Sequence, residues 1–281
     1  DVLAELMYKD QPAGWSILGP EKNIRSFNTK TFTEYRKKHY VASATVVMVA
    51  GDIKEAEIIK KIEKIFSTIS KDKKHKKLAV ITNQKNPEIK IAYKKTDQTH
   101  LVIAMRTFSI TDKRLATMRV LSAVLGQGMS SRLFSKMRDE LGICYYIKTS
   151  HDVSTDHGEL TISAGVDNTR VEIGIKNILI ELKRMKDELV SAEELKKAKA
   201  YISGTTMLEL ETSDAQAEFT GYQEILKGQI ESPEIIIQKT QKVTAEEVCA
   251  LAREIFLDKG LNMAIVGPYK DAQKFGNMLH L

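Results

Sequence analysis

The sequence lacks the long apolar segments that anchor or export a protein. Its longest wholly apolar stretch with good strand character, residues 46–50 with their neighbours, is far shorter than the roughly 20 residues that a membrane-spanning helix needs. Residues 1–10 mix acidic residues with a lysine and show neither the basic start nor the apolar stretch of a secretory signal. We therefore expect no membrane span and, by default, a soluble cytoplasmic protein.

Cysteines and aromatic residues are also scarce. The only two cysteines, Cys144 and Cys249, lie in apolar surroundings and cannot make a disulfide framework, so we expect two small buried residues. Aromatic residues make up 6% of the chain, and its net charge of +6 comes largely from lysines spread over helix faces. This composition favours a solvated surface over a nucleic-acid groove. The basic run at residues 71–77 is interpreted as a solvated linker, with an electrostatic contact to a partner as the alternative.

The 281 residues suffice for two domains of ordinary size. Periodicity predicts a helix from about Thr31 to Tyr40, a buried strand over residues 45–50 and a helix carrying Ile58, Ile62 and Phe66. After residue 88 we expect two strands, a helix, a turn at residues 126–131 and a second helix that ends at Gly142. A strand pair over residues 143–149 and 158–166 precedes a mainly helical remainder. Strands followed by runs of helices indicate an α+β fold.

A weak internal repeat indicates two copies of one domain. Residues 45–56 resemble residues 261–272, and each stretch follows a capped amphipathic helix. The second copy has far more residues before its repeated glycine, Gly267, than the first has before Gly51. We therefore expect the first copy to be truncated at its N-terminus. An insertion in the second copy would give the same difference in length.

Two groups of motifs stand out along the chain. The first comprises Ile17-Leu-Gly19, Phe32-Thr-Glu-Tyr35 and His39-Tyr40, ahead of residues 46–52. The second comprises Leu125-Gly-Gln-Gly-Met-Ser-Ser-Arg-Leu-Phe134 and Met137-Arg-Asp-Glu-Leu-Gly-Ile-Cys-Tyr145. Together they resemble the pitrilysin/insulinase-type zinc peptidases, particularly bacterial members akin to the mitochondrial processing peptidase. The first group is similar to the family segment that leads into its Val-Val-Gly-Asp strand, and the second to the signature of the family's second, non-zinc domain. The resemblance spans essentially the whole chain.

The resemblance implies two homologous domains, each an antiparallel sheet flanked by helices. Residues 1–78 would be the C-terminal portion of the zinc-bearing first domain, residues 79–88 a linker, and residues 89–281 the substrate-holding second domain. In the family, zinc is held by two histidines of an H-x-x-E-H helix and a later glutamate, because histidines four apart on a helix can grip one ion. None of the six histidines here is followed four residues later by another. Zinc ligands are therefore expected upstream of Asp1, and none within this chain.

The residues that the resemblance carries over are Arg138 and Tyr145, which in the family reach the substrate backbone. A guanidinium and a phenol are donors that can hold a peptide carbonyl. The alternative for Arg138 is a surface arginine near a helix C-terminus, and for Tyr145 a tyrosine packed in the sheet. Tyr146 should point to the opposite face of its strand and is the weaker candidate.

Two other motifs carry less weight. The stretch Gly126-Gln127-Gly128 begins like a dinucleotide-binding fingerprint, but position 131 is serine where that fingerprint needs glycine. We therefore favour a turn between helices, close to bound peptide. The polar residues around a hairpin tip, His151-Asp152 and Asp156-His157, could bind a metal, although turn polarity explains them equally well.

The first functional hypothesis is part of a zinc metalloendopeptidase that binds and cleaves peptides in an enclosed chamber, inactive on its own. The expected partners are a peptide and either the missing zinc-bearing segment or a partner subunit, in a homodimer or heterodimer. The second hypothesis is a non-catalytic subunit or scaffold of a processing-peptidase-like assembly. A nucleic-acid-binding role is not expected, because the charge lacks interleaved aromatic residues.

Overall fold

The computed structural model describes residues 1–281 and divides the chain into two compact units. The first unit combines Asp1–Trp15, Val80–Thr206 and Ser232–Leu281. The second combines Ser16–Ala79 with Met207–Glu231. Residues 1–15 therefore pack with the sheet-bearing unit, a long-range association that the sequence pattern did not indicate.

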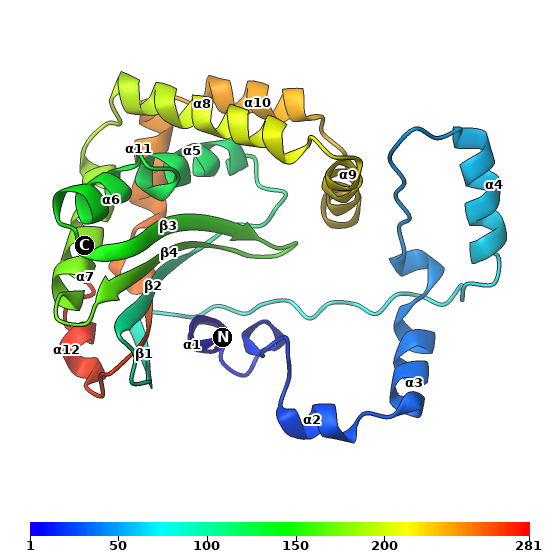
Figure 1. Cartoon of the computed structure of the whole chain (residues 1–281), viewed down its shortest axis with the longest axis horizontal. Coiled ribbons are helices and arrows are strands. Elements are labelled where there is room, and N and C mark those ends of the chain that lie inside the picture. The colour runs from blue at the N-terminus through cyan, green and yellow to red at the C-terminus, as the bar shows by residue number, and fades with distance from the viewer. The chain divides into compact units, whose positions relative to one another are not determined.

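A five-stranded sheet forms the centre of the first unit, in the order β1-β5-β2-β4-β3 (Figure 1). The strands are β1 (Glu88–Tyr93), β2 (Gln98–Thr107), β3 (Cys144–Val153), β4 (Gly158–Asp167) and β5 (Leu261–Gly267). Neighbouring strands are antiparallel except β1 and β5, which are parallel. The predicted α+β class is confirmed, and the sheet is antiparallel as expected except at the β1–β5 pair. Because β5 inserts between β1 and β2, which run in opposite directions, it can be antiparallel to only one of them.

Helices pack against both faces of this sheet. On one face α5, α7 and α11 cover the strands and bury the side chains of Leu101, Ile103, Leu160, Ile162 and Ile265. On the other face α1 places Met7 and Tyr8 against Ala104. The helices of this unit are α1 (Val2–Tyr8), α5 (Leu115–Gly126), α6 (Arg132–Phe134), α7 (Val171–Asp187), α8 (Ala192–Glu209, as far as Thr206), α10 (Pro233–Lys242), α11 (Ala245–Ile255) and α12 (Ala272–Gly276).

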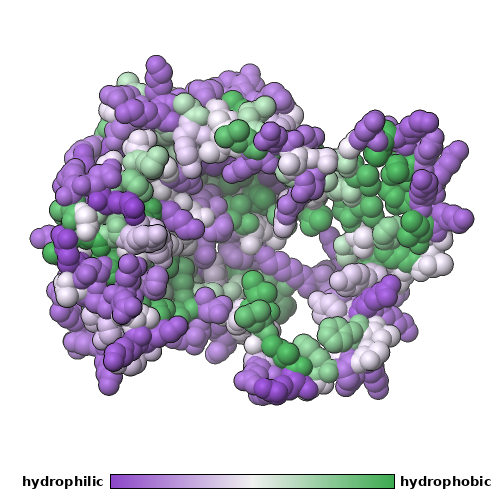
Figure 2. Space-filling view, in the orientation of Figure 1, coloured by the Kyte–Doolittle hydropathy of each residue, from purple (hydrophilic) through white to green (hydrophobic).

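The second unit has no strand of the sheet. It contains α2 (Glu21–Ser26), α3 (Thr29–His39), α4 (Glu55–Phe66) and α9 (Ser213–Lys227). None of α2, α3 or α4 contains a fully buried residue. Figure 2 shows that α4 has one hydrophobic and one hydrophilic face, as its helical periodicity predicts.

The predicted buried strand over residues 45–50 is wrong. Residues 45–50 form neither helix nor strand, and the side chains of Val46, Val47 and Val49 are exposed. A strand is stable only when a neighbouring strand takes its backbone hydrogen bonds, and the second unit supplies none. The matching copy, β5, is buried because β1 and β2 flank it.

Most of the predicted helix boundaries are confirmed. Thr244 and Glu247 form the predicted capping box of α11, and Ser232 caps α10 with Pro233 in its first turn. The start of α3 differs from the prediction, because its N-cap is Asn28 rather than Thr31. Thr31 is instead the third residue of the helix and completes a capping box with Asn28. No helix combines the length and the apolar character needed to cross a bilayer.

Candidate functional site

The two predicted substrate-binding residues lie on either side of Gly142, where the chain passes from a helix into β3. Arg138 belongs to a π-helical turn (Ser135–Glu140) that continues α6, and Leu141 N–H donates to the carbonyl oxygen of Lys136 at 3.2 Å, five residues back. Buried Met137 fixes this turn to the core. A π turn adds a residue to the helix and thereby rotates the side chains that follow, an irregularity frequent at functional sites.

Gly142 ends this helix in the predicted left-handed conformation, with φ +55°. A side chain is strained at such a φ, so glycine suits the position. Beyond it, Ile143 N–H donates to the carbonyl oxygen of Met137 at 3.0 Å, which directs the chain back into β3.

A β-bulge at the start of β3 turns Tyr145 out of the strand's regular alternation. Cys144 pairs with Val166 and Tyr146 pairs with Gly165, so Tyr145 is the extra residue without a partner on β4. Bulges re-aim side chains next to functional sites and break the ladder locally. The π turn, Gly142 and the bulge together decide where Arg138 and Tyr145 project.

The structure brings these two side chains together. The guanidinium carbon of Arg138 lies 5.5 Å from the centre of the Tyr145 ring and 5.7 Å from that of Phe134, both within cation–π range. Tyr145 is 71% exposed, which rules out a tyrosine packed in the sheet. Neither the guanidinium nor the phenol hydroxyl makes a hydrogen bond or ion pair within residues 1–281, so the donors of both point to solvent.

The neighbours of Tyr145 face elsewhere. Burial raises the pKa of the Cys144 thiol, an effect that nearby Arg138 opposes. Tyr146 lies over Gly165, where a Cβ atom would come within 2.6 Å of the Tyr146 ring. Its hydroxyl is 3.1 Å from His100 Nδ1, and burial raises its pKa. Tyr146 thus pairs with β2 and takes no part in the Arg138 cluster.

The predicted turn at residues 126–131 is held against α8 by an ion pair. Arg132 Nε donates to Glu194 Oε1 at 2.7 Å and Arg132 Nη2 to Glu194 Oε2 at 3.1 Å, a bidentate pair with the Arg132 side chain only 8% exposed. The hydrogen bonds from Arg132 hold the pKa of Glu194 at about 2. The pair fixes the turn that leads into α6 and Arg138.

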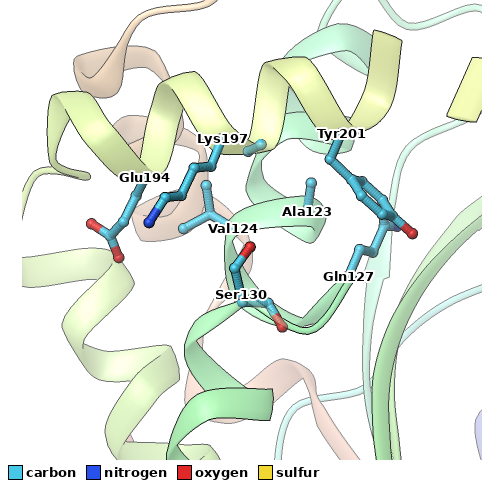
Figure 3. A pocket seen from close by; sticks show the side chains of 9 residues that line it. Ala123, Val124, Gln127, Ser130, Glu194, Lys197 and Tyr201 are labelled. Carbon is cyan, nitrogen blue, oxygen red and sulfur yellow. The ribbon is translucent and has the colours of Figure 1, made fainter. Parts of the chain in front are cut away.

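A small cavity of about 20 Å³ lies between this turn and α8 (Figure 3). It is lined by Gln127 and Ser130 of the turn and by Glu194, Lys197 and Tyr201 of α8. The volume accommodates about one water molecule. We therefore interpret it as a packing defect beneath the turn and assign it no ligand.

Sequence reasoning assigned Glu194 only to a capping box with Ser191, which the structure confirms. It missed Arg132, because the partner of that arginine lies 62 residues away. An arginine directly before the buried Leu133 gave no local signal of its own.

The residues of this chain do not fit a zinc site. No group of three or more His, Cys, Asp or Glu side chains among residues 1–281 could hold a metal ion. The histidines of the hairpin tip diverge: His151 Nε2 contacts Thr107 Oγ1 at 3.0 Å, and burial lowers its pKa to about 4. His157 pairs instead with Asp156 and packs edge-on against Tyr8. The hairpin tip is therefore no metal site.

A sequence profile described as the Peptidase M16 inactive domain matches residues 26–202. The chain belongs to the M16 peptidase family. It is 30% identical over 268 residues to an uncharacterized zinc protease of Bacillus subtilis, covering 95% of this chain and 64% of that protein. An uncharacterized zinc protease of Rickettsia bellii is also 30% identical over 268 residues, covering 93% of this chain and 63% of that protein. This M16 chain thus spans less than two thirds of either relative.

Solved structures show the same fold at lower identity. A peptidase M16 inactive domain from Pseudomonas fluorescens matches with a TM-score of 0.85 at 17% identity, over 95% of this chain and 64% of that one. A chain of complex III2 from Candida albicans matches with a TM-score of 0.87 at 17% identity, over 100% of this chain and 70% of that one. The predicted resemblance to zinc metallopeptidases is confirmed at the level of family and fold.

Proposed function

We propose that this M16 chain is the substrate-holding part of a zinc-dependent endopeptidase, and that Arg138 and Tyr145 bind the backbone of an extended peptide. The observation that carries the proposal is the exposed Arg138–Tyr145 pair, with its donors unused by the protein. Zinc would be held outside this chain, in another segment of the same polypeptide or in a partner subunit of a homodimer or heterodimer.

The chemistry of the pair suits a peptide carbonyl. A guanidinium offers five N–H donors in a fixed plane, and a phenol adds one O–H donor. Such donors stabilise negative charge as it develops on a carbonyl oxygen, and one well-placed donor contributes about 2.7–4 kcal/mol to catalysis. Because the contacts would be to backbone atoms, the pair should impose little preference for particular substrate side chains.

The rigid surroundings of the pair support a positioning role. Preorganised donors act best when folding, rather than substrate binding, fixes them. Met137, Gly142 and the bulge at Tyr145 are all set by the core and the sheet. We propose that this part of the chain presents Arg138 and Tyr145 to the substrate with little rearrangement.

The direct experiment measures peptide cleavage by the full-length protein, or by this chain supplied with its zinc-bearing part. Arg138→Ala and Tyr145→Phe should each lower turnover by about tenfold or more. Tyr93 and Lys270 provide matched controls, because Lys270 Nζ lies 5.3 Å from the centre of the exposed Tyr93 ring at the opposite edge of the sheet. Tyr93→Phe and Lys270→Ala should leave turnover within about twofold.

A second measurement separates binding from cleavage. Fluorescence anisotropy of an uncharged, extended, labelled peptide should report weaker binding for Arg138→Ala and unchanged binding for Lys270→Ala. If both site variants cleave and bind like the unaltered protein, Arg138 and Tyr145 have no substrate role.

The alternative is a non-catalytic subunit or scaffold. The specific observation in its favour is that a chain of complex III2 shares this fold with a TM-score of 0.87. Metal analysis of the full-length protein distinguishes the two. A stoichiometric zinc ion with peptide cleavage supports the peptidase, and a protein without zinc that assembles with another subunit supports the scaffold.

A further inference from the structure

The positive charge of this protein is concentrated on one surface of the second unit. The lysine surface, as we call it, combines the C-terminal turn of α3 with residues 71–77. Its charged members are Arg36, Lys37, Lys38, Lys71, Asp72, Lys73, Lys74, Lys76 and Lys77. These include eight of the chain's 43 basic residues but only one of its 37 acidic residues, a formal charge of +7. Since the whole chain carries +6, the remainder is slightly acidic.

Tertiary contacts within the second unit assemble this surface from two distant segments. Val41 and Ser70 form a parallel β-bridge, and Ala42 N–H donates to the carbonyl oxygen of Ser70 at 2.7 Å. Ser43 Oγ donates to the carbonyl oxygen of Asp72 at 3.0 Å and accepts from Lys74 N–H at 2.9 Å.

The same contacts continue through aromatic rings. The imidazole centres of His39 and His75 are 4.9 Å apart, and His39 stacks on Tyr35 at 4.3 Å. The two basic segments are therefore held side by side by the fold.

The charges on this surface are largely unneutralised. Arg36, Lys37, Lys38 and residues 71–77 are all exposed. No carboxylate of residues 1–281 pairs with Arg36, Lys37, Lys38, Lys71, Lys73, Lys74 or Lys76. Elsewhere in the chain exposed lysines commonly pair along a helix, as Lys183 does with Asp187 and Lys197 with Glu193. Like charges held close together repel one another, and an anionic partner would relieve that repulsion.

The shape of the surface favours a linear partner. Residues 71–79 form neither helix nor strand and run as an extended trace (Figure 1). The five lysines of residues 71–77 follow one another along this trace, so their charges form a line rather than a compact cluster. A flat membrane would reach only one side of such a segment, whereas an extended polymer can lie along it.

The residue types favour a polypeptide over a nucleic acid. Seven of the eight cations are lysines, which act as point charges and pair with single carboxylates without the planar fork through which arginine binds anions bidentately. The run at residues 71–77 contains no Phe, Tyr or Trp on which a base could stack, and the neighbouring ring of Tyr35 already stacks on His39. We propose that the lysine surface binds an acidic polypeptide segment rich in Asp and Glu. This inference is independent of the proposed function, because it needs neither zinc nor the Arg138–Tyr145 pair.

The test uses a short fluorescein-labelled peptide of alternating glutamate and glycine, with a glutamine–glycine peptide as the uncharged comparison. The variant is the fourfold substitution Lys71→Gln, Lys73→Gln, Lys74→Gln and Lys76→Gln. Its matched control replaces four exposed lysines outside the surface, namely Lys94, Lys95, Lys113 and Lys196, with glutamine. Both variants should melt at the same temperature as the unaltered chain, which shows that they are folded.

We expect the unaltered chain to bind the acidic peptide with an affinity that falls steeply with salt, and the surface variant to bind about tenfold or more weakly. The matched control should bind within about twofold of the unaltered chain, because its lysines are dispersed. The glutamine–glycine peptide should show no difference between the two variants.

Three results would overturn the inference. One is equal loss of binding in both variants, which would indicate a response to net charge alone. Another is tighter binding of a DNA oligonucleotide of matched length, and a third is capture only by phosphatidylserine vesicles. The roles of Arg138 and Tyr145 are tested separately, by cleavage of an uncharged peptide by the full-length protein. The proposed function and the acidic-peptide inference can therefore fail independently of each other.

Discussion

Residues 45–51 and strand β5 have similar sequences and opposite environments in the two units of this protein. In β5, Ile265 is fully buried between β1 and β2, with helices against one face of the sheet. In the second unit the equivalent residue, Val49, is 44% exposed and has no neighbouring strand. A β-branched apolar run has the propensity for a strand, but its burial depends on neighbours that supply hydrogen bonds and apolar contacts.

The comparison extends to the polar groups. In the sheet-bearing unit, the buried guanidinium of Arg132 forms an ion pair with the partly buried Glu194, and this pair fixes a loop. In the second unit, the lysine surface is exposed and its charges are mostly unpaired. One unit therefore positions a site by packing, and the other presents charge to solvent. The five predictions below challenge this contrast.

The largest effect should come from removing equivalent apolar side chains. Ile265→Ala should lower the free energy of unfolding by about 3–5 kcal/mol, because it leaves a cavity in a close-packed core. Val49→Ala should lower it by less than about 1 kcal/mol, because its side chain is half in water already. Urea denaturation followed by circular dichroism checks both. Equal losses would show that the two copies are equally buried.

Breaking the partly buried Arg132–Glu194 ion pair should have the next largest effect. Glu194→Ala should cost about 2–3 kcal/mol, because Arg132 stays buried without its partner. The matched variant in the second unit, Glu57→Ala, removes an exposed pair with Lys54 and should cost less than about 0.5 kcal/mol.

The same pair predicts a pH dependence. Because the pKa of Glu194 lies at about 2 in the folded protein, below its ordinary value of 4.5, its stabilisation is fully present above pH 5 or so. That stabilisation is lost as the pH falls from about 5 to about 2. The difference in unfolding free energy between the unaltered protein and Glu194→Gln should shrink over this window, and a constant difference would contradict the assignment.

Glycine substitution should separate stability from function. Gly142→Ala places a side chain at φ +55° and should cost about 1 kcal/mol, and it should also weaken peptide binding by shifting Arg138 relative to Tyr145. Gly19→Ala, at φ +68° in the second unit, should cost a similar amount without affecting that binding. Thermal denaturation and peptide anisotropy measure the two effects. Comparable binding by both variants would show that the π turn and bulge position Arg138 without help from Gly142.

The smallest effect on stability is expected at the site itself. The Tyr145 hydroxyl makes no hydrogen bond within the chain, so Tyr145→Phe should change the free energy of unfolding by less than about 0.5 kcal/mol. Tyr8→Phe should cost more, about 1 kcal/mol, because its hydroxyl donates to Glu159 Oε2 at 2.9 Å. Chemical denaturation of both variants tests this, and a large loss for Tyr145→Phe would indicate a structural role.

Local chemistry in the sequence was enough to predict much of the fold. The capping boxes at Ser191 and Thr244, the left-handed glycine at Gly142 and the alternation of β4 each depend on residues within a few positions of one another. Hydrogen bonds over three or four residues and a period of two are readable in any sequence. Arg138 and Tyr145 were predicted from a family motif, since spacing alone cannot show that a π turn and a bulge would bring them together.

The sequence by itself determined the α+β class, most helix ends and the family to which the chain belongs. Only the tertiary structure decided which apolar runs are buried, where β5 inserts, which partner Arg132 takes and how the basic residues of α3 meet residues 71–77. The physical reason is the same in each case: burial, strand pairing and ion pairing depend on residues distant in the chain, and a propensity describes only what a segment can do when such neighbours are present.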